Sequence, residues 1–144
     1  MLHNAAESVS EYSPSTLLAG YFSQLRETID AVGAERVATE TGLAADRIDA
    51  IANGDQPSLT AEEAASILAT AASTPDTDAI VFELRDHLLM GMTTAVLDVD
   101  TIAATAETDL TGQEVQQVIE GRTELPLRQL AAIQSVIETR TEER

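Results

Sequence analysis

The chain has 144 residues, 44% of them hydrophobic, and its formal net charge is −17. This length and apolar content are typical of one compact domain or two small ones, and they argue against wholesale disorder. The absence of cysteine excludes disulfides and thiolate metal sites, and no apolar run reaches the roughly 18 residues that a membrane-spanning helix needs.

The first predicted element after a polar segment is a long helix. Residues 1–12 carry no strong pattern and are expected to be flexible. Ser13 then supplies a helix cap and Pro14 suits the first helical position, while Gly33 marks the end of the helix. Between them, apolar residues recur at helical spacing, namely Leu17, Leu18, Tyr21, Phe22, Leu25, Ile29 and Val32.

Three shorter helices follow. Helical periodicity predicts them over residues 35–41, 46–53 and 60–72, separated by glycine-containing turns and a polar loop. The third opens with Thr60 and Glu63, a capping box in which each side chain satisfies the other residue's backbone amide. The segment 73–76 is the only convincing linker, and we place a module boundary there.

The second half begins with a longer helix that starts at Asp76 or Asp78. Its apolar stripe is wide enough to contact both halves, so we expect this helix in a shared core. The stripe consists of Ile80, Val81, Leu84, Leu88, Leu89, Met92, Val96 and Leu97.

The remaining elements repeat the pattern of the first half. Asp98 or Asp100 caps a short helix, and Thr111 with Glu114 forms a second capping box for the helix that ends at Gly121. A last helix follows Pro126, and residues 139–144 are expected to be a frayed, charged tail. No segment shows the alternation of a strand, so the predicted fold is all-α.

An internal repeat relates the two halves. Adding 67 to the residue number carries Glu40 to Glu107, Thr41 to Thr108, Leu43 to Leu110, Ile48 to Val115, Ile51 to Val118 and Gly54 to Gly121. We therefore predict about eight helices in two related four-helix modules, over residues 13–73 and 74–138.

Each module resembles the helix-turn-helix domains of phage repressors of the Cro and lambda-repressor type. The resemblance rests on small, apolar and turn positions, which are Val37, Ala38, Gly42, Leu43, Ile48 and Ile51 in the first module. The equivalent positions in the second are Ala104, Thr105, Asp109, Leu110, Val115 and Val118. Asp109 replaces the expected glycine, but aspartate can adopt the left-handed conformation. The whole arrangement also resembles an uncharacterised domain family of haloarchaea, which implies no activity.

The composition resembles that of proteins from salt-loving archaea. Asp and Glu number 25, and all eight basic residues are arginine. At about 1 M salt the Debye length is about 3 Å, so a negative net charge argues only weakly against a nucleic-acid partner. We expect the acidity to be a solubility adaptation.

The resemblance implies that the second helix of each pair carries the residues that read DNA bases. In the first module the exposed positions are Ala44, Ala45, Asp46, Asp49, Ala50 and Asn53. Methyl groups and carboxylates do not suit phosphates, and only Arg47 is available for a backbone contact. We interpret this helix as structural.

In the second module the residues at the equivalent exposed positions are polar. The candidate DNA-binding residues are Thr111, Gln113, Gln116, Gln117, Arg122 and Arg128. Glutamine can bind adenine through two hydrogen bonds, and arginine can contact phosphate. Glutamine is equally a good helix former on a solvated surface, so both interpretations stay open.

Two functional hypotheses follow. One is a transcriptional regulator that binds double-stranded DNA through the helix 111–121, as a homodimer. The alternative is a non-catalytic protein-interaction or structural module that retains the fold. If Glu114 and Glu120 share a face with the glutamines, the alternative gains.

An enzyme is not expected. The sequence has no glycine-rich phosphate loop and no Ser-His-acid set, and its two histidines, His3 and His87, have no partner at metal-ligand spacing. We predict no cofactor, no metal and no membrane partner. Since no signal peptide is visible at the N-terminus, we expect a soluble cytoplasmic protein.

Overall fold

The computed structural model describes residues 1–8, 11–106 and 108–143, and this part of the chain contains nine helices and no strand. The prediction of an all-α fold is confirmed. The 3-10 helix is η1 (Leu2–Ser8), and the α-helices are α1 (Pro14–Val32), α2 (Ala34–Thr41), α3 (Ala45–Ala52), α4 (Ala61–Leu68), α5 (Thr77–Ala95), α6 (Val99–Thr105), α7 (Gly112–Ile119) and α8 (Leu127–Glu143).

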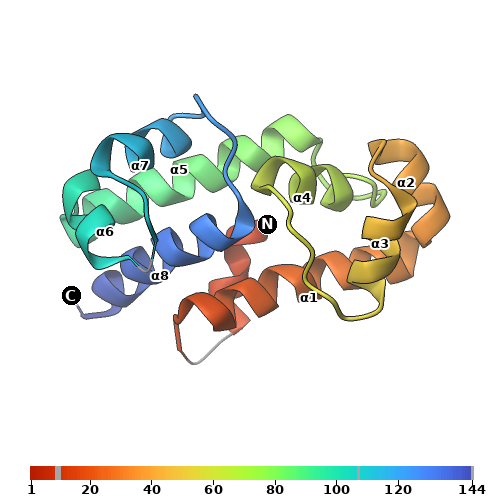
Figure 1. Cartoon of the computed structure of the whole chain (residues 1–144), viewed down its shortest axis with the longest axis horizontal. Helices are drawn as coiled ribbons and strands as arrows, with labels where there is room; N and C mark the ends of the chain where they lie inside the picture. The colour runs from red at the N-terminus through yellow and green to blue at the C-terminus, as the bar shows by residue number, and fades with distance from the viewer. Residues whose placement is uncertain (9–10, 107, 144) are drawn as a thin grey trace.

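Four helices form the centre of the molecule, and a pair of short helices lies at each end. Figure 1 shows α1, α4, α5 and α8 in the middle, with α2 and α3 at one end and α6 and α7 at the other. Helix α1 packs against α8, and α5 packs against both α4 and α8, so the long helices join one half of the chain to the other.

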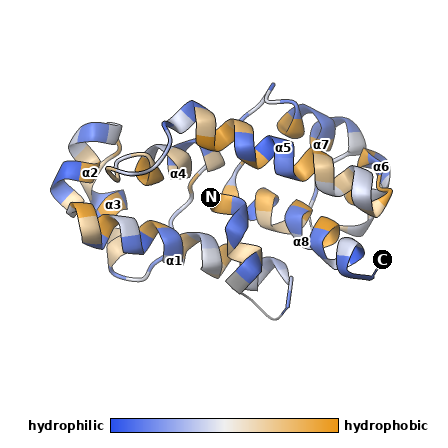
Figure 2. Ribbon diagram, turned by 180° about the vertical axis from the view of Figure 1, so that it is seen from behind, coloured by the Kyte–Doolittle hydropathy of each residue, from blue (hydrophilic) through white to orange (hydrophobic). Residues whose placement is uncertain are grey.

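One hydrophobic cluster runs through both halves. Leu25 and Ile67 from the first half are fully buried, as are Leu88 and Ile133 from the second, and all four belong to the same cluster. Along α5 apolar and polar residues alternate in blocks (Figure 2), because only one side of this helix faces the cluster. The expected position of α5 in a shared core is confirmed.

A backbone pairing between equivalent loops also ties the halves together. The loop before α4 and the loop before α8 run antiparallel, with Ala61 N donating to Leu125 O at 2.6 Å and Leu127 N donating to Leu59 O at 2.8 Å. These loops occupy corresponding places in the internal repeat. Equivalent segments of the two repeats therefore pair with each other at the centre of the molecule.

The predicted helix starts are confirmed at the positions where a capping side chain indicated them. Ser13 accepts a hydrogen bond from Thr16 N, and Pro14 is the first residue of α1. Both capping boxes are present, at the starts of α4 and α7. Asp76 and Asp98 cap α5 and α6. Caps are local contacts, which explains why the sequence predicts them well.

Several predicted boundaries differ from the structure, and three of the differences are large. Residues 2–8 form η1, with Leu2 and Ala5 buried in the core cluster, where an irregular flexible segment was expected. Helix α4 ends at Leu68, since Ala69 is its C-cap and turns follow. Helix α8 continues through Glu143, so its last turns extend into the predicted tail, of which residue 144 lies outside the described residues.

Candidate functional site

The helix that was predicted to read DNA is α7, and its two sides differ in burial. Val115, Val118 and Ile119 are buried in the core cluster. Gln113 and Gln116 are exposed on the opposite side, as helical spacing requires. The helix therefore presents a polar face to solvent, as predicted from the inward valines.

The candidate DNA-binding residues are not all equally available. The structure places them as follows: Gln113, Gln116, Arg122 and Arg128 are exposed, Thr111 is exposed but caps α7, and Gln117 is half-buried. The Thr111 hydroxyl accepts a hydrogen bond from Glu114 N at 3.2 Å, and Thr111 N donates to the Glu114 carboxylate at 3.0 Å. Two glutamines and two arginines among the candidates are thus exposed and take no part in capping.

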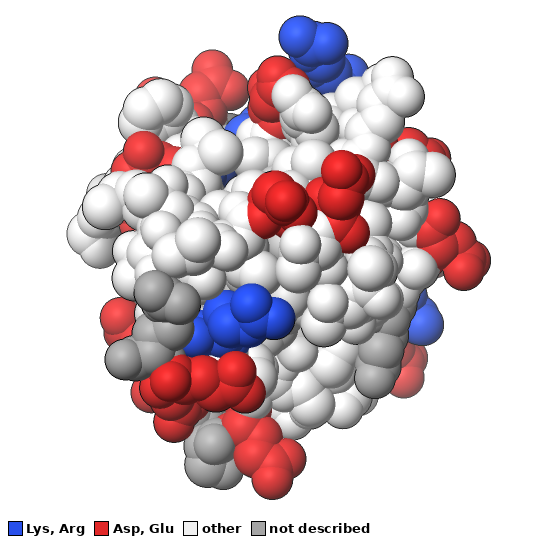
Figure 3. All heavy atoms as spheres, turned by 90° about the vertical axis from the view of Figure 1, so that its left-hand side faces the viewer, with Lys and Arg blue, Asp and Glu red and all other residues white. Residues whose placement is uncertain are grey.

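A carboxylate shares the face of these glutamines. Glu120 follows Gln116 by four residues, which places both on one side of α7 and its C-terminal turn. The Arg122 guanidinium lies 3.7 Å from the Glu120 carboxylate, so its charge is partly compensated. Figure 3 views the end of the molecule that carries α6 and α7, where acidic side chains outnumber basic ones. This arrangement favours the protein-interaction or structural module over the DNA-binding regulator.

The connection between α6 and α7 also departs from the family pattern. Six residues, 106–111, separate these helices, whereas a helix-turn-helix normally has a turn of about three or four residues. Asp109 was expected in the left-handed conformation, but among the described non-glycine residues only Val96 has a positive φ. Ala104 and Thr105, which occupy the apolar and small positions of the family pattern, are both exposed. The buried residue of α6 is Ile102.

The first helix pair has the expected turn but no reading surface. Three residues join α2 to α3, and Gly42 adopts the left-handed conformation with φ 75°. Arg47 donates to the Glu63 carboxylate at 2.9 Å and to Ser58 O at 2.8 Å, so it holds α3 to α4 and is not free for phosphate. Hydrogen bonding from Arg47 also lowers the pKa of Glu63.

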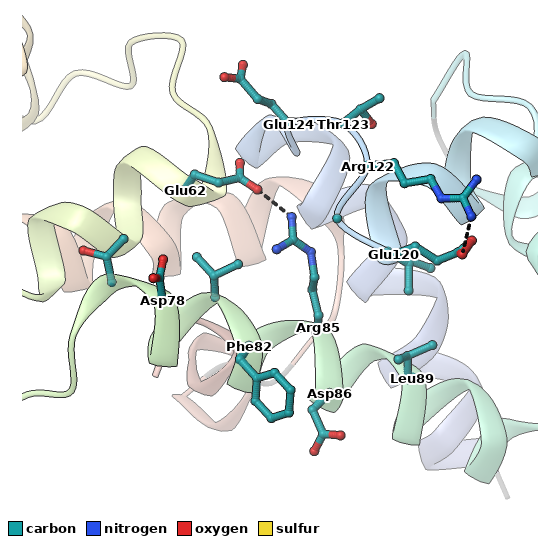
Figure 4. A pocket seen from close by; sticks show the side chains of 14 residues that line it. Glu62, Asp78, Phe82, Arg85, Asp86, Leu89, Glu120, Arg122, Thr123 and Glu124 are labelled. Atoms are coloured by element: carbon teal, nitrogen blue, oxygen red, sulfur yellow. Dashed lines mark hydrogen bonds and ion pairs between the residues drawn. The ribbon is translucent and has the colours of Figure 1, made fainter.

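A groove lies beside α7, between α5 and the loop that leads from α7 to α8. Its volume is about 710 Å3. Phe82 and Leu89 line it from α5 (Figure 4). Ile119 lines it from the end of α7. Phe82 is 73% exposed and Leu89 is 49% exposed, so both apolar side chains meet solvent.

Arg85 lines the groove and joins α5 to α4 and to the end of α7. Its guanidinium donates to the Glu62 carboxylate at 2.7 Å and to Val118 O at 3.4 Å, as Figure 4 shows for the Glu62 contact. The other oxygen of Glu62 accepts from Leu125 N at 3.1 Å. At Gly121, which has φ 81°, a Cβ atom would lie 3.1 Å from the guanidinium carbon. Glycine at this position allows the positive φ of the turn and leaves space for the Arg85 side chain.

A buried polar cluster lies elsewhere, where η1 meets α1, α5 and α8. The rings of His3 and His87 stack with centroids 4.3 Å apart, and His87 contacts the Glu138 carboxylate at 2.8 Å. Gln134 is fully buried; it accepts from the Tyr21 hydroxyl and donates to His3 O at 3.0 Å. The polar side chains of Tyr21, Gln134, His87 and Glu138 all have hydrogen-bond partners within this cluster, which is typical of a structural network.

Sequence reasoning missed both the groove and the polar cluster. The apolar stripe of α5 omits Phe82, and that omission was itself a signal, since an apolar residue off the stripe points away from the core. Leu89 was assigned to the core and is instead half-exposed. For the stacked histidines, 84 positions apart, no local pattern exists.

Metal and membrane features are sparse. Among the described residues, no group of three or more His, Asp or Glu side chains is arranged to hold a metal ion. Within the same residues, no single helix has the length and apolar character to cross a membrane; α5 and α6 meet the criterion only jointly, across a 91° bend.

Comparisons with known proteins identify a family but no characterised relative. Neither the curated proteins nor the solved structures gave a match. A family model described as a family of unknown function, DUF5791, matches residues 17–140, which include α2 to α7 and most of α1 and α8. The chain belongs to the DUF5791 family.

Proposed function

We propose that this protein is a non-catalytic protein-binding module and that the groove between α5 and the α7–α8 loop is its binding surface. The exposure of Phe82 carries the proposal. The chain has only two phenylalanines, and while Phe22 is buried, Phe82 is 73% exposed beside Leu89. Exposed apolar side chains grouped around a concave surface and rimmed by polar ones are typical of interaction sites.

The second candidate is a helix-turn-helix DNA-binding regulator. Two exposed glutamines on α7 favour it, together with Arg128, for which the described residues supply no ion pair. Glu120 and the six-residue connection before α7 weigh against it. In molar salt little counterion release is available to compensate for a carboxylate near phosphate.

The acid-rich, lysine-free composition supports placing this module in the cytoplasm of a halophile. A protein partner suits that setting, because apolar burial persists at high salt whereas long-range attraction between charges does not. We propose no cofactor and no catalytic residue.

One experiment with two variant sets separates the candidates. Phe82→Ser/Leu89→Ser alters the groove, and Gln113→Ala/Gln116→Ala/Gln117→Ala alters the face of α7. Each protein is immobilised in about 2 M KCl and exposed to native cell extract and, separately, to random genomic duplex fragments. Helix content by circular dichroism shows that all three proteins are folded.

We expect protein partners that the wild type and the glutamine variant retain and the groove variant loses. Binding of a retained partner is then measured with the purified protein by calorimetry. Enrichment of particular DNA sequences that disappears with the glutamine variant would establish the DNA-binding regulator instead. If the groove variant captures the same partners as the wild type, the proposed binding surface is wrong.

A further inference from the structure

We infer that the occupant of the groove is a positively charged amphipathic helix of another protein. This inference rests on the proposed function, and it specifies the chemistry of the partner. Three features of the groove carry it: the spacing of its apolar side chains, the charges left unpaired on its rim, and its length.

The apolar side chains are spaced to receive a helix. Phe82 and Leu89 are seven residues apart on the exposed side of α5, which corresponds to about two turns and roughly 10 Å. Val81 and Ile119 lie deeper, at the edge of the core cluster. A partner helix aligned with α5 would place apolar residues at positions i and i+7 against the two exposed side chains.

The rim leaves negative charge without compensation. Both arginines that line the groove are already engaged, Arg85 with Glu62 at 2.7 Å and Arg122 with Glu120 at 3.7 Å. Three further carboxylates line the groove, and none has an ion pair among the described residues; they are Asp78, Asp86 and Glu124. A ligand that covers them must supply cations, or their desolvation opposes binding.

The same charges argue against a second copy of this chain. The groove offers no uncompensated arginine among the described residues that line it, so two copies packed groove to groove would bring like charges together. Each copy also carries a net charge of −17. Arginine or lysine at the flanks of a heterologous helix supplies the missing cations to the rim. Ion pairs that become partly buried in the complex are screened by salt much less than exposed charges are.

The length of the groove sets the length of the partner. It follows α5 from Thr77 to Leu89, which is about 18 Å at 1.5 Å per residue. A helix of about three turns covers this span. With about 710 Å3 enclosed, the groove holds one face of such a helix, while the other face stays in solvent.

The test is a selection from a displayed library of random peptides of about 15 residues, against the full-length protein in about 2 M KCl. Enriched peptides are synthesised with a fluorophore, and their affinities are measured by anisotropy. Phe82→Ser and Asp86→Arg are the test variants. Met90→Ser is the apolar control, because Met90 is 63% exposed on the same helix but does not line the groove. Asp49→Arg on α3 is the charge control.

We expect enriched peptides with apolar residues at helical spacing and an excess of arginine and lysine. Their binding should weaken at least about tenfold with Phe82→Ser and about fivefold with Asp86→Arg, while both controls bind as the wild type does. Circular dichroism of the bound peptide should show a gain of helix.

Several outcomes would overturn the inference. Enriched peptides that are acidic or neutral, peptides that bind Phe82→Ser as well as wild type, or no enrichment at all would each do so. A homodimer in sedimentation velocity that Phe82→Ser dissociates would assign the groove to a second copy. If native partners are lost with the groove variant but present no cationic helix, the protein-binding function stands and only this inference falls.

Discussion

Glu120 lies four residues after Gln116 on the exposed face of α7, and Arg122 approaches its carboxylate at 3.7 Å. One carboxylate at this position changes what the helix can bind. Glutamine side chains reach base edges only when the helix enters the groove between the phosphates. In such a complex Glu120 would also lie close to phosphate, and the two negative charges would repel each other. At the residue scale, this side chain is the main physical reason against DNA, while the exposure of Phe82 supports a protein partner.

Three of the eight arginines join helices to one another inside the molecule. Arg47 joins α3 to α4, and Arg85 joins α5 to α4 and to the end of α7. Arg26 donates to Ile51 O at 3.2 Å and thereby links α1 to α3. Since arginine can form several hydrogen bonds in a fixed geometry, it suits such bridges. The sequence showed eight arginines but not which of them are free.

The stability of the fold should depend on the protonation of His3. Burial, followed by the nearby N-terminal amine and His87, lowers the pKa of His3 from 6.5 to about 4. The unfolded chain then binds more protons than the folded chain between these values. Stability is therefore fully present above pH 6.5 and falls as the pH decreases toward 4. With 13% of the side chain exposed, we expect a loss of about 1–2 kcal/mol.

Urea unfolding at pH 7 and pH 5 measures this effect. His3→Gln should reduce the difference between the two pH values, and Asn4→Gln, on the exposed side of η1, should retain it. The lowered pKa values of Glu138 and Glu83, due first to hydrogen bonds from His87 and from the N-terminal amine, add a further loss below about pH 4.5. An unchanged pH dependence in His3→Gln would contradict the assignment.

At the scale of a single element, α5 ends in an unusual way. Val96 adopts the left-handed conformation, with φ 55° and ψ 54°, as the C-cap of this helix. The conformation is unfavourable for a β-branched residue, and glycine normally occupies it. The Val96 side chain is 70% exposed, so little packing offsets the cost.

Val96→Gly should therefore raise the free energy of unfolding by about 0.5–1 kcal/mol. The gain from relieving the left-handed strain exceeds the loss from the greater freedom of glycine in the unfolded chain. Met90→Gly, inside the same helix, should lower it by about 1 kcal/mol and serves as the control. Thermal and urea unfolding measure both. If Val96→Gly destabilised the protein, the side chain would have a packing role that its exposure does not indicate.

Neither helix pair has both features expected of a DNA-binding helix-turn-helix, which are the short turn and a polar reading helix. The first pair has the three-residue turn with Gly42, and the second has the glutamines. Because α6 ends at Thr105 and Ala106 is extended, the second connection takes a different path. Resemblance at individual positions did not reveal this difference, since the length of a connection depends on where each helix stops.

At the scale of the whole molecule, the halves share their interior. Helix α1 packs on α8, α4 packs on α5, and the loops before α4 and α8 pair through their backbones. Separating the halves would expose Leu25 and Ile67 on one side and Leu88 and Ile133 on the other. The free energy of these contacts is available only when both halves are folded.

We therefore expect the protein to unfold in one cooperative transition. In urea, the loss of helix by circular dichroism and the loss of native amide signals from α3 and α7 in nuclear magnetic resonance spectra should share one midpoint. These two helices lie at opposite ends of the molecule (Figure 1). Two separated transitions would show instead that each half is stable without the other.

The sequence by itself determined the eight α-helices, the side chains that cap them at Ser13, Thr60, Asp76, Asp98 and Thr111, and most of the apolar side chains that enter the core. Caps such as Ser13 and the Thr60–Glu63 box act over three or four residues, and helical periodicity is a local property, so both can be read along the chain. Only the tertiary structure decided that His3 stacks on His87 and that Phe82 faces solvent over a groove. Both depend on how segments far apart in the sequence pack together, whereas the shared face of Gln116 and Glu120 follows from their four-residue spacing in a helix.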